Sequence, residues 1–257
     1  MGIDTNNRIN RKQISNDYQA RTSLSNAQQE PDDTSIFVSD SVDSQFAQNV
    51  IEQYADLSAN NKKVSNVIVL ATPDTNQIEE IKEIDDKDKA VLKDYIENGA
   101  SDSYGFYSKK SDSIVIIQSN HNRKETKYEG ELAEQGADTM LHEYAHLLDK
   151  NISSSDEYKQ AYYEDLKAIE KQLKENPNAK IAGSDMTYKE AMVYFDHYYE
   201  GADFSDGIDE SDVTRRGLRE NFAESYATVK DNQRSEVNDI YSTLFPHTTE
   251  FVREYVA

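Results

Sequence analysis

The sequence predicts an α+β fold, in which a small mixed sheet is followed by a mostly helical C-terminal half. Short runs rich in β-branched or aromatic residues occur at 35–40, 66–71 and 104–120, and such runs are typical of strands. Beyond residue 130, apolar residues instead recur at intervals of three and four, which is typical of helices. Strands gathered before helices indicate an α+β layout.

The chain has 257 residues, enough to bury a full core as one domain. Residues 1–34 are polar and poor in aromatic side chains, which predicts a disordered or loosely packed arm. We therefore expect a single folded domain over residues 35–257.

The first half of this domain is predicted to alternate between strands and helices. A strand at 35–40 precedes a helix at 43–60, and a strand at 66–71 precedes one or two helices at 76–99. Residues 104–120 predict two strands around a turn at 109–112. The apolar residues of this hairpin alternate with others, so we expect it to be half-buried.

The second half is predicted to be helical from residue 139 onward. After the helix at 139–150, helical patterns cover 155–175, 186–199, 216–231, 234–243 and 247–256.

The charge and the cysteine count exclude several classes of function. The net charge is −21, which argues against nucleic acid or an anionic membrane as a partner, and indicates a monodisperse, monomeric protein. The chain has no cysteine, so disulfides, thiol catalysis and cysteine-based zinc sites are excluded. No apolar run approaches the ~18 residues of a membrane span.

The stretch TMLHEYAHLLDK, residues 139–150, carries the most informative motif. His142 and His146 are four positions apart, so on a helix they lie on one face and can bind a common metal ion. Glu143 lies about 100° around the helix, where its carboxylate can accept a proton from a metal-bound water. This is the HExxH pattern of zinc peptidases.

Another face of the same helix can pack in a core, through Leu141, Tyr144, Ala145 and Leu148. The alternative interpretation is a surface helix with two solvated histidines. His121 and His247 are isolated in the sequence, and we expect them on the surface or in loops.

A catalytic zinc site needs a third protein ligand. The metzincin arrangement requires a ligand six residues after His146, where this chain has Ile152. A later glutamate is the alternative. In LRENFAESYATVK (218–230), Glu220 and Glu224 lie one helical turn apart, so one can bind zinc while the other accepts the free N–H of a ligating imidazole. Glu190 is the second candidate.

Together, HEYAH, ENFAESYA and the terminal FPHTTEFVREYV resemble the lethal-factor-type zinc metallopeptidases, which include the catalytic domain of anthrax lethal factor and the bacterial Pro-Pro endopeptidases. The resemblance covers about residues 100–257. It implies a zincin fold of the gluzincin type, with one Zn²⁺ held by His142, His146 and Glu220. Glu143 would be the general base, and Glu224 would support a ligand.

The chain departs from the family pattern at two places. His146 and Glu220 are 74 residues apart, which implies a helical insertion at about 155–205 and keeps Glu190 open as the third ligand. The family also has a tyrosine near the metal, seven residues before the ligand glutamate, where this chain has Val213. Five residues are candidates to replace it: His197, Tyr198, Tyr199, Arg215 and Arg216.

The resemblance implies an endopeptidase that cleaves a protein or peptide substrate, as a secreted or delivered bacterial virulence factor or toxin. The cysteine-free composition suits a protein that works outside the producing cell, and no signal peptide is visible. A cytoplasmic location is the alternative. The second functional hypothesis is a catalytically silent zincin-like domain that binds a partner protein through its acidic surface.

Overall fold

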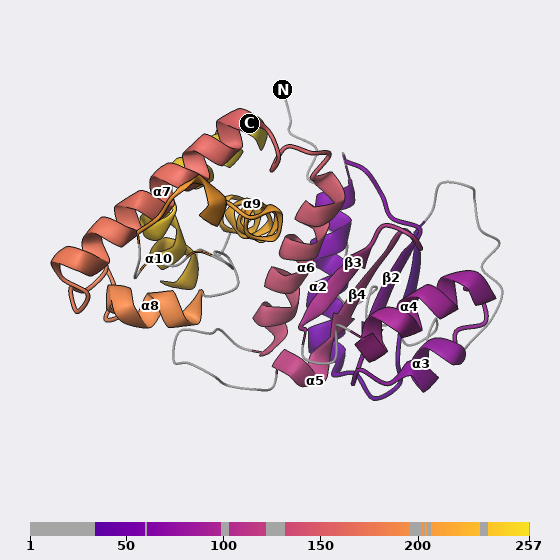
Figure 1. Cartoon of the computed structure of the whole chain (residues 1–257). Helices are drawn as coiled ribbons and strands as arrows, with labels where there is room; N and C mark the ends of the chain where they lie inside the picture. The colour runs from indigo at the N-terminus through magenta and orange to yellow at the C-terminus, as the bar shows by residue number, and fades with distance from the viewer. Residues whose placement is uncertain are drawn as a thin grey trace, which may run out of the picture.

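The chain forms an α+β fold with a four-stranded mixed sheet and a mostly helical remainder (Figure 1). The computed structural model describes residues 34–59, 61–98, 103–121, 132–195, 202, 204, 207–231 and 236–256. The strands are β1 (Ser35–Val38), β2 (Asn66–Leu70), β3 (Gly105–Ser108) and β4 (Ser113–Ile117). The helices of the first half are α2 (Ser44–Ser58), α3 (Thr75–Glu79), α4 (Asp86–Asn98), α5 (Gln118–His121) and α6 (Leu132–Leu148). Those of the second half are α7 (Asp156–Glu175), α8 (Tyr188–Tyr194), α9 (Arg215–Lys230), α10 (Glu236–Leu244) and α11 (Pro246–Val256), with a short 3-10 turn, η2 (Glu210–Asp212).

The predicted strands and helices are present in the described residues, and the segment at 76–99 forms two helices, α3 and α4. Two bounds differ from the prediction: α6 begins at Leu132 and not at residue 139, and α8 ends at Tyr194, while residues 196–199 of the predicted helix at 186–199 lie outside the described residues. The predicted arm at 1–34 lies outside the described residues except for Thr34. The Thr34 hydroxyl donates to the backbone oxygen of Val64 at 2.7 Å, so this residue belongs to the folded part.

The sheet has the strand order β1-β2-β4-β3. β1, β2 and β4 run parallel, whereas β3 is antiparallel to β4 and forms an edge. The predicted mixed sheet is therefore confirmed. The edge position of β3 matters for the site, because this strand lies against α6.

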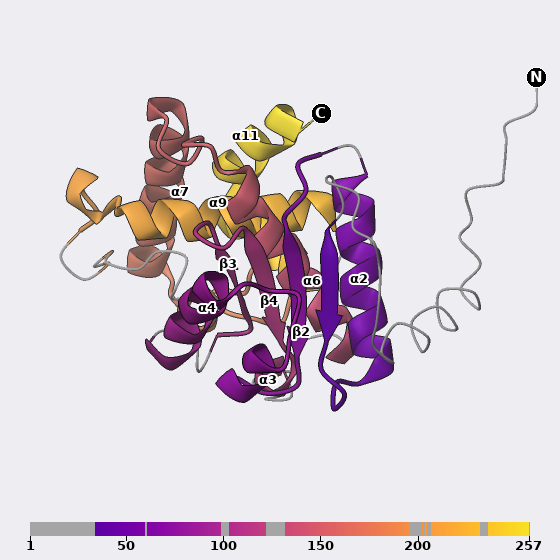
Figure 2. The ribbon, with the colours of Figure 1, turned by 90° about the vertical axis from the view of Figure 1, so that its right-hand side faces the viewer.

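Helices cover both faces of the sheet (Figure 2). α2 and α6 pack on the face that carries Val67, Val69, Ile114 and Ile116. α3 and α4 pack on the opposite face, so every residue of β4 is buried. The expectation of a half-buried hairpin was therefore wrong for β4, because the α3–α4 segment covers the face that we expected to meet solvent.

Close packing against α2 fixes the position of α6. A Cβ atom on Gly136 would lie 2.6 Å from the ring of Phe46, so only glycine permits this approach of the two helices. One turn before the end of α6, the hydroxyl of the fully buried Tyr144 donates to the backbone oxygen of Lys62 at 2.5 Å. These contacts turn the opposite side of α6, with its histidines, toward the helical half.

The helical half is built around α9, which contacts α7, α10 and α11 and packs against α6 (Figure 1). The segment predicted as an insertion, about 155–205, contributes α7 and α8. Asp165 of α7 caps the start of α11 by accepting the backbone N–H of Thr248 at 3.0 Å. Across the described residues, no helix is both long and apolar enough to cross a membrane.

His121 and His247 differ from each other in burial. His247 lies on α11, with its side chain 51% exposed and its Nδ1 2.7 Å from the carboxylate of Asp165. His121, in contrast, is only 3% exposed and packs between the rings of Phe46 and Tyr104. The expectation of a surface or loop position was therefore wrong for His121, since the short helix α5 turns its side chain inward.

Candidate metal centre

Helices α6 and α9 bring two histidines and a glutamate together. His142 and His146 lie one turn apart on α6, and their ring centroids are 4.9 Å apart with the planes nearly perpendicular at 83°. Glu220 reaches them from α9. One ligand atom from each of the three residues lies within 4.8 Å of the others. The structure thus assembles the three residues proposed from the sequence as metal ligands.

The spacing of the donor atoms suits a tetrahedral metal ion. The Oε2 atom of Glu220 lies 3.2 Å from Nε2 of His142 and 3.5 Å from Nε2 of His146. Ligands bound to zinc at ~2.0–2.1 Å in a tetrahedron are roughly 3.3 Å apart. Two imidazole nitrogens and one carboxylate oxygen are also a donor set that zinc prefers. These three residues could therefore hold a zinc ion.

The carboxylate of Glu224 lies on the other side of the His142 ring. Its Oε2 atom is 3.2 Å from Nδ1 of His142, so Glu220 and Glu224 flank this imidazole. The fourth glutamate considered, Glu190, lies elsewhere. It closes a capping box at the start of α8, where its Oε2 accepts the backbone N–H of Thr187 at 2.8 Å. Among the described residues, Glu190 does not join the metal-binding group.

The pKa values of His142 and Glu220 are both strongly perturbed. Burial disfavours the charged form of His142, but hydrogen bonds to Glu220 and Glu224 outweigh it and raise the pKa of the imidazole well above its usual value. For Glu220, burial favours the neutral acid, yet the two histidines lower the pKa of its carboxyl group far below the usual range. Without a metal, His142 and Glu220 form a partly buried ion pair. A divalent cation would take the place of the protons on the facing nitrogens.

Glu143 lies on the sheet side of α6 and is 7% exposed. Burial raises the pKa of its carboxyl group, while His146, His142 and the backbone N–H of Tyr107 act in the opposite direction. Tyr107 belongs to the edge strand β3. The proposed base therefore lies between the histidine pair and the sheet edge.

One polar atom of the centre has no hydrogen-bond partner among the described residues. It is Nδ1 of His146, which is buried. If Nε2 of this ring binds a metal, Nδ1 carries the proton, and its acceptor is not one of the described protein groups. Among the described residues, His146 therefore has no carboxylate at Nδ1 comparable to that of Glu224 at His142.

Of the five residues considered as replacements for the tyrosine that this chain lacks at position 213, two lie among the described residues. His197, Tyr198 and Tyr199 lie outside the described residues. Arg215 and Arg216 are exposed in the first turn of α9, and Arg216 lies one turn before Glu220. Val213 precedes the N-cap residue of that helix and is partly buried against the core.

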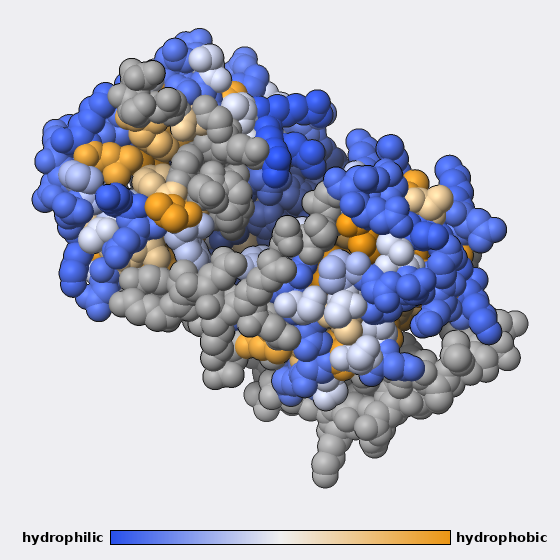
Figure 3. All heavy atoms as spheres, turned by 60° about the horizontal axis from the view of Figure 1, so that its bottom comes forward, coloured by the Kyte–Doolittle hydropathy of each residue, from blue (hydrophilic) through white to orange (hydrophobic). Residues whose placement is uncertain are grey.

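The surface is hollowed between the sheet-bearing half and the helical half, and hydrophilic residues dominate its visible rims (Figure 3). α6 and α9, which carry the candidate ligands, come from these two halves and pack against each other. A cluster shared between two packed helices at such a boundary is a common setting for a ligand site.

Sequence reasoning did not identify the contact between Tyr107 and Glu143. The signal available was the alternation of apolar residues in the hairpin at 104–120, which does not show which of its strands faces α6. Comparison with family models, with curated proteins and with solved structures finds no match to this chain. The site is therefore interpreted from its own geometry.

Proposed function

We propose that the chain is a zinc-dependent endopeptidase with a zincin fold of the gluzincin type. The observation that carries the proposal is the convergence of His142, His146 and Glu220, with donor spacings of 3.2 and 3.5 Å that suit tetrahedral zinc. The adjacent Glu143 supports catalysis in addition to metal binding. A purely structural zinc site would have no need for a buried carboxylate beside an open metal position.

Zinc, when bound, would acidify a water molecule and polarise the carbonyl group of the scissile peptide. The protein residues supply the rest. His142, His146 and Glu220 hold the ion, and Glu224 orients the ring of His142. Glu143 takes a proton from the attacking water and passes it to the leaving amine.

The edge strand β3 offers a place for the substrate backbone. The backbone N–H of Ile117 donates to the oxygen of Tyr104 at 2.8 Å, and alternation along an antiparallel pair then turns the polar groups of Gly105 and Tyr107 away from β4. A peptide added beside β3 as a further strand would lie next to Glu143. This arrangement supports an extended peptide as the substrate.

The alternative function is a catalytically silent zincin-like domain that binds a partner protein. Its support is the net charge of −21, which gives a surface suited to a basic partner. We further propose action outside the producing cell, as a virulence-type factor, in keeping with the cysteine-free composition.

The test combines metal analysis with a cleavage assay. Purified protein is expected to hold one zinc ion per chain and to cleave members of a peptide library, and a chelator is expected to stop cleavage until zinc is restored. Stoichiometric zinc with no cleavage of any peptide would support the binding domain. Protein that takes up no zinc would contradict the zinc-dependent endopeptidase.

A further inference from the structure

Helix α9 carries a buried polar residue, Asn221, directly after Glu220 in the chain. Its side chain is fully buried and is held from two directions. The Tyr158 hydroxyl donates to Oδ1 of Asn221 at 2.6 Å, and Nδ2 of Asn221 donates to the Tyr241 hydroxyl at 2.6 Å. The Tyr241 hydroxyl in turn donates to the backbone oxygen of Asn221 at 3.0 Å.

This cluster joins three helices, because Tyr158 lies on α7, Asn221 on α9 and Tyr241 on α10. Both tyrosine side chains are also fully buried. Buried polar groups need hydrogen-bond partners, so a rotation of α9 that moved Asn221 away from the two tyrosines would leave its amide group buried and unsatisfied. Asn221 is satisfied on both sides in the observed rotation, so the cluster selects that rotation.

The rotation of α9 decides where its glutamates point. Successive residues of an α-helix are about 100° apart, so Asn221 lies about 100° from Glu220 and about 60° from Glu224. Among the described residues, the Glu220 carboxylate has hydrogen-bond or ion-pair contacts with His142 and His146 alone, and 26% of its side chain is exposed. The direction of Glu220 therefore depends on how α9 is held.

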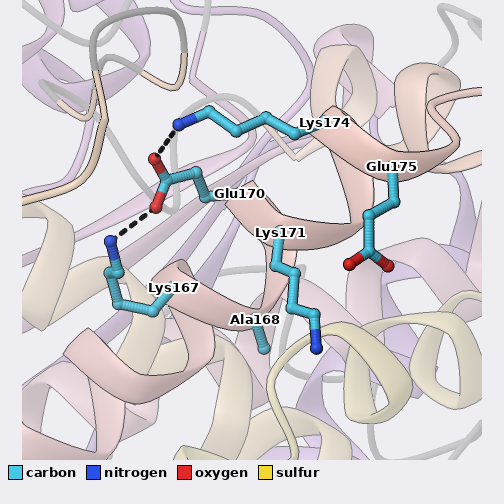
Figure 4. A pocket seen from close by; sticks show the side chains of 6 residues that line it. All are labelled: Lys167, Ala168, Glu170, Lys171, Lys174 and Glu175. Carbon is cyan, nitrogen blue, oxygen red and sulfur yellow. Dashed lines mark hydrogen bonds and ion pairs between the residues drawn. The ribbon is translucent and has the colours of Figure 1, made fainter.

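A separate contact holds the segment that leads into α9. Glu170 of α7 lies between Lys167 and Lys174 and forms ion pairs with both, at 2.7 and 2.5 Å (Figure 4). The Lys167 ammonium also donates to the backbone oxygen of Ile208 at 3.3 Å. These contacts hold the approach to the helix, whereas Asn221 holds α9 itself, at the position next to Glu220.

We infer that Asn221, clamped by Tyr158 and Tyr241, is a positioning residue that directs Glu220 at the metal and Glu224 at Nδ1 of His142. This inference rests on the proposed zinc centre. It gives the long segment between His146 and Glu220 a role, because α7 comes from that segment and supplies Tyr158. The insertion thus buttresses the helix that carries the third ligand.

The test compares three variants with a matched control. Asn221→Leu removes both hydrogen-bonding groups at similar volume, while Tyr158→Phe and Tyr241→Phe each remove one hydroxyl and keep the ring. The control is Tyr54→Phe, which also removes a buried hydroxyl, one that accepts the backbone N–H of Val64 at 3.1 Å in the sheet-bearing half. The measurements are zinc affinity by chelator competition, the absorption spectrum of the cobalt-substituted protein, and the unfolding midpoint of the metal-free protein.

We expect Asn221→Leu to bind zinc about 10- to 100-fold more weakly and to alter the cobalt spectrum, as is typical when support of a ligand is lost. The two phenylalanine variants should show smaller changes in the same direction, and they carry the test if Asn221→Leu does not fold. Tyr54→Phe should lower the unfolding midpoint but leave zinc affinity and the cobalt spectrum unchanged. Wild-type zinc affinity and spectrum in all three variants would overturn the inference.

A metal-free crystal structure of Asn221→Leu, or of Tyr158→Phe if Asn221→Leu does not fold, separates this inference from the proposed function. We expect Glu220 Oε2 to move away from its position 3.2 Å from His142 Nε2. An unchanged distance would overturn the positioning role. This measurement stands even if the wild-type protein takes up no zinc. Zinc binding without peptide cleavage would contradict the enzyme and leave the positioning role intact.

Discussion

The carboxylate of Glu224 lies 3.2 Å from Nδ1 of His142, on the side of the ring opposite the one that faces Glu220. A carboxylate at Nδ1 accepts the proton of that nitrogen, so a metal ion that replaced the proton on Nε2 would find the lone pair of Nε2 directed at the position between the two helices. The same contact restricts rotation of the imidazole ring. Glu224 therefore selects both the tautomer and the orientation that metal binding requires.

This relationship predicts the effect of removing the Glu224 carboxylate. Glu224→Ala should weaken zinc binding by about 10- to 100-fold, because His142 loses the group that orients it. Glu224→Gln should have a smaller effect, since its amide oxygen can still accept the N–H. Chelator competition measures both. Glu254→Ala, an exposed glutamate of α11, serves as the control and should bind zinc like the wild type.

Glu143→Gln tests the role of the proposed base. The amide has the shape of the carboxylate but cannot take a proton from water, so cleavage should fall by about 100- to 10,000-fold. Zinc content should be unchanged, because Glu143 is not among the three residues that converge on the metal position. Peptide cleavage and metal analysis on the same preparation give both values, and an undiminished cleavage rate would refute the role.

The choice between Glu220 and Glu190 as third ligand can be made with a pair of variants. Glu220→Ala should abolish stoichiometric zinc binding, because it removes one of three protein donors. Glu190→Ala should retain zinc and lower the free energy of unfolding by about 0.5–2 kcal/mol, since it breaks the capping box of α8. Metal analysis and urea unfolding distinguish them, and the opposite pattern would make Glu190 the ligand.

Local patterns in the sequence were sufficient for much of the fold and for the core of the site. His142 and His146, like Glu220 and Glu224, are spaced by one helical turn, so each pair could be placed on one face before the fold was known. The close approach of α6 and α9 is a tertiary contact that helical periodicity does not encode. The need for a third zinc ligand left Glu220 and Glu190 open, and the family resemblance then favoured Glu220 and hence the approach of α9 to α6.

Contacts between distant residues could not be predicted in the same way. The hydrogen bond between Tyr158 and Asn221 joins residues 63 positions apart, and neither residue stands out in the sequence. The burial of both faces of β4 depends on where α3 and α4 fold back, which a short apolar run does not specify. His121 was expected on the surface or in a loop for the same reason, because its neighbours in space are Phe46 of α2, Tyr104 just before β3, and Thr139 of α6.

The buried imidazole of His121 predicts a pH dependence of stability. Its Nδ1 lies 2.8 Å from the backbone oxygen of Ile117 and must donate, so its Nε2 accepts from the Thr139 hydroxyl at 2.8 Å. In this neutral form, both ring nitrogens have a hydrogen-bond partner. Burial lowers the pKa of the ring from 6.5 to about 4, against the opposing effect of backbone hydrogen bonds.

The direction in which pH changes the stability follows from proton binding by the folded and unfolded chains. Between pH 6.5 and about 4 the unfolded chain binds a proton at His121 that the folded chain does not, so the free energy of unfolding falls as the pH falls through this window. The loss attributable to this group is about 3 kcal/mol when complete. Carboxyl groups also change the free energy of unfolding in this pH range. Comparing the wild type with a variant that lacks only the imidazole of His121 separates the contribution of His121 from theirs.

His121→Asn provides that comparison, because its amide N–H can still donate to the Ile117 oxygen but does not titrate. Urea unfolding of the metal-free proteins at several pH values from 7 to 4 should give a shallower decline for His121→Asn than for the wild type. Tyr54→Phe is the control for general destabilisation: it should be less stable at every pH but retain the wild-type slope. Equal slopes for His121→Asn and the wild type would show that another group sets the acid sensitivity in this window.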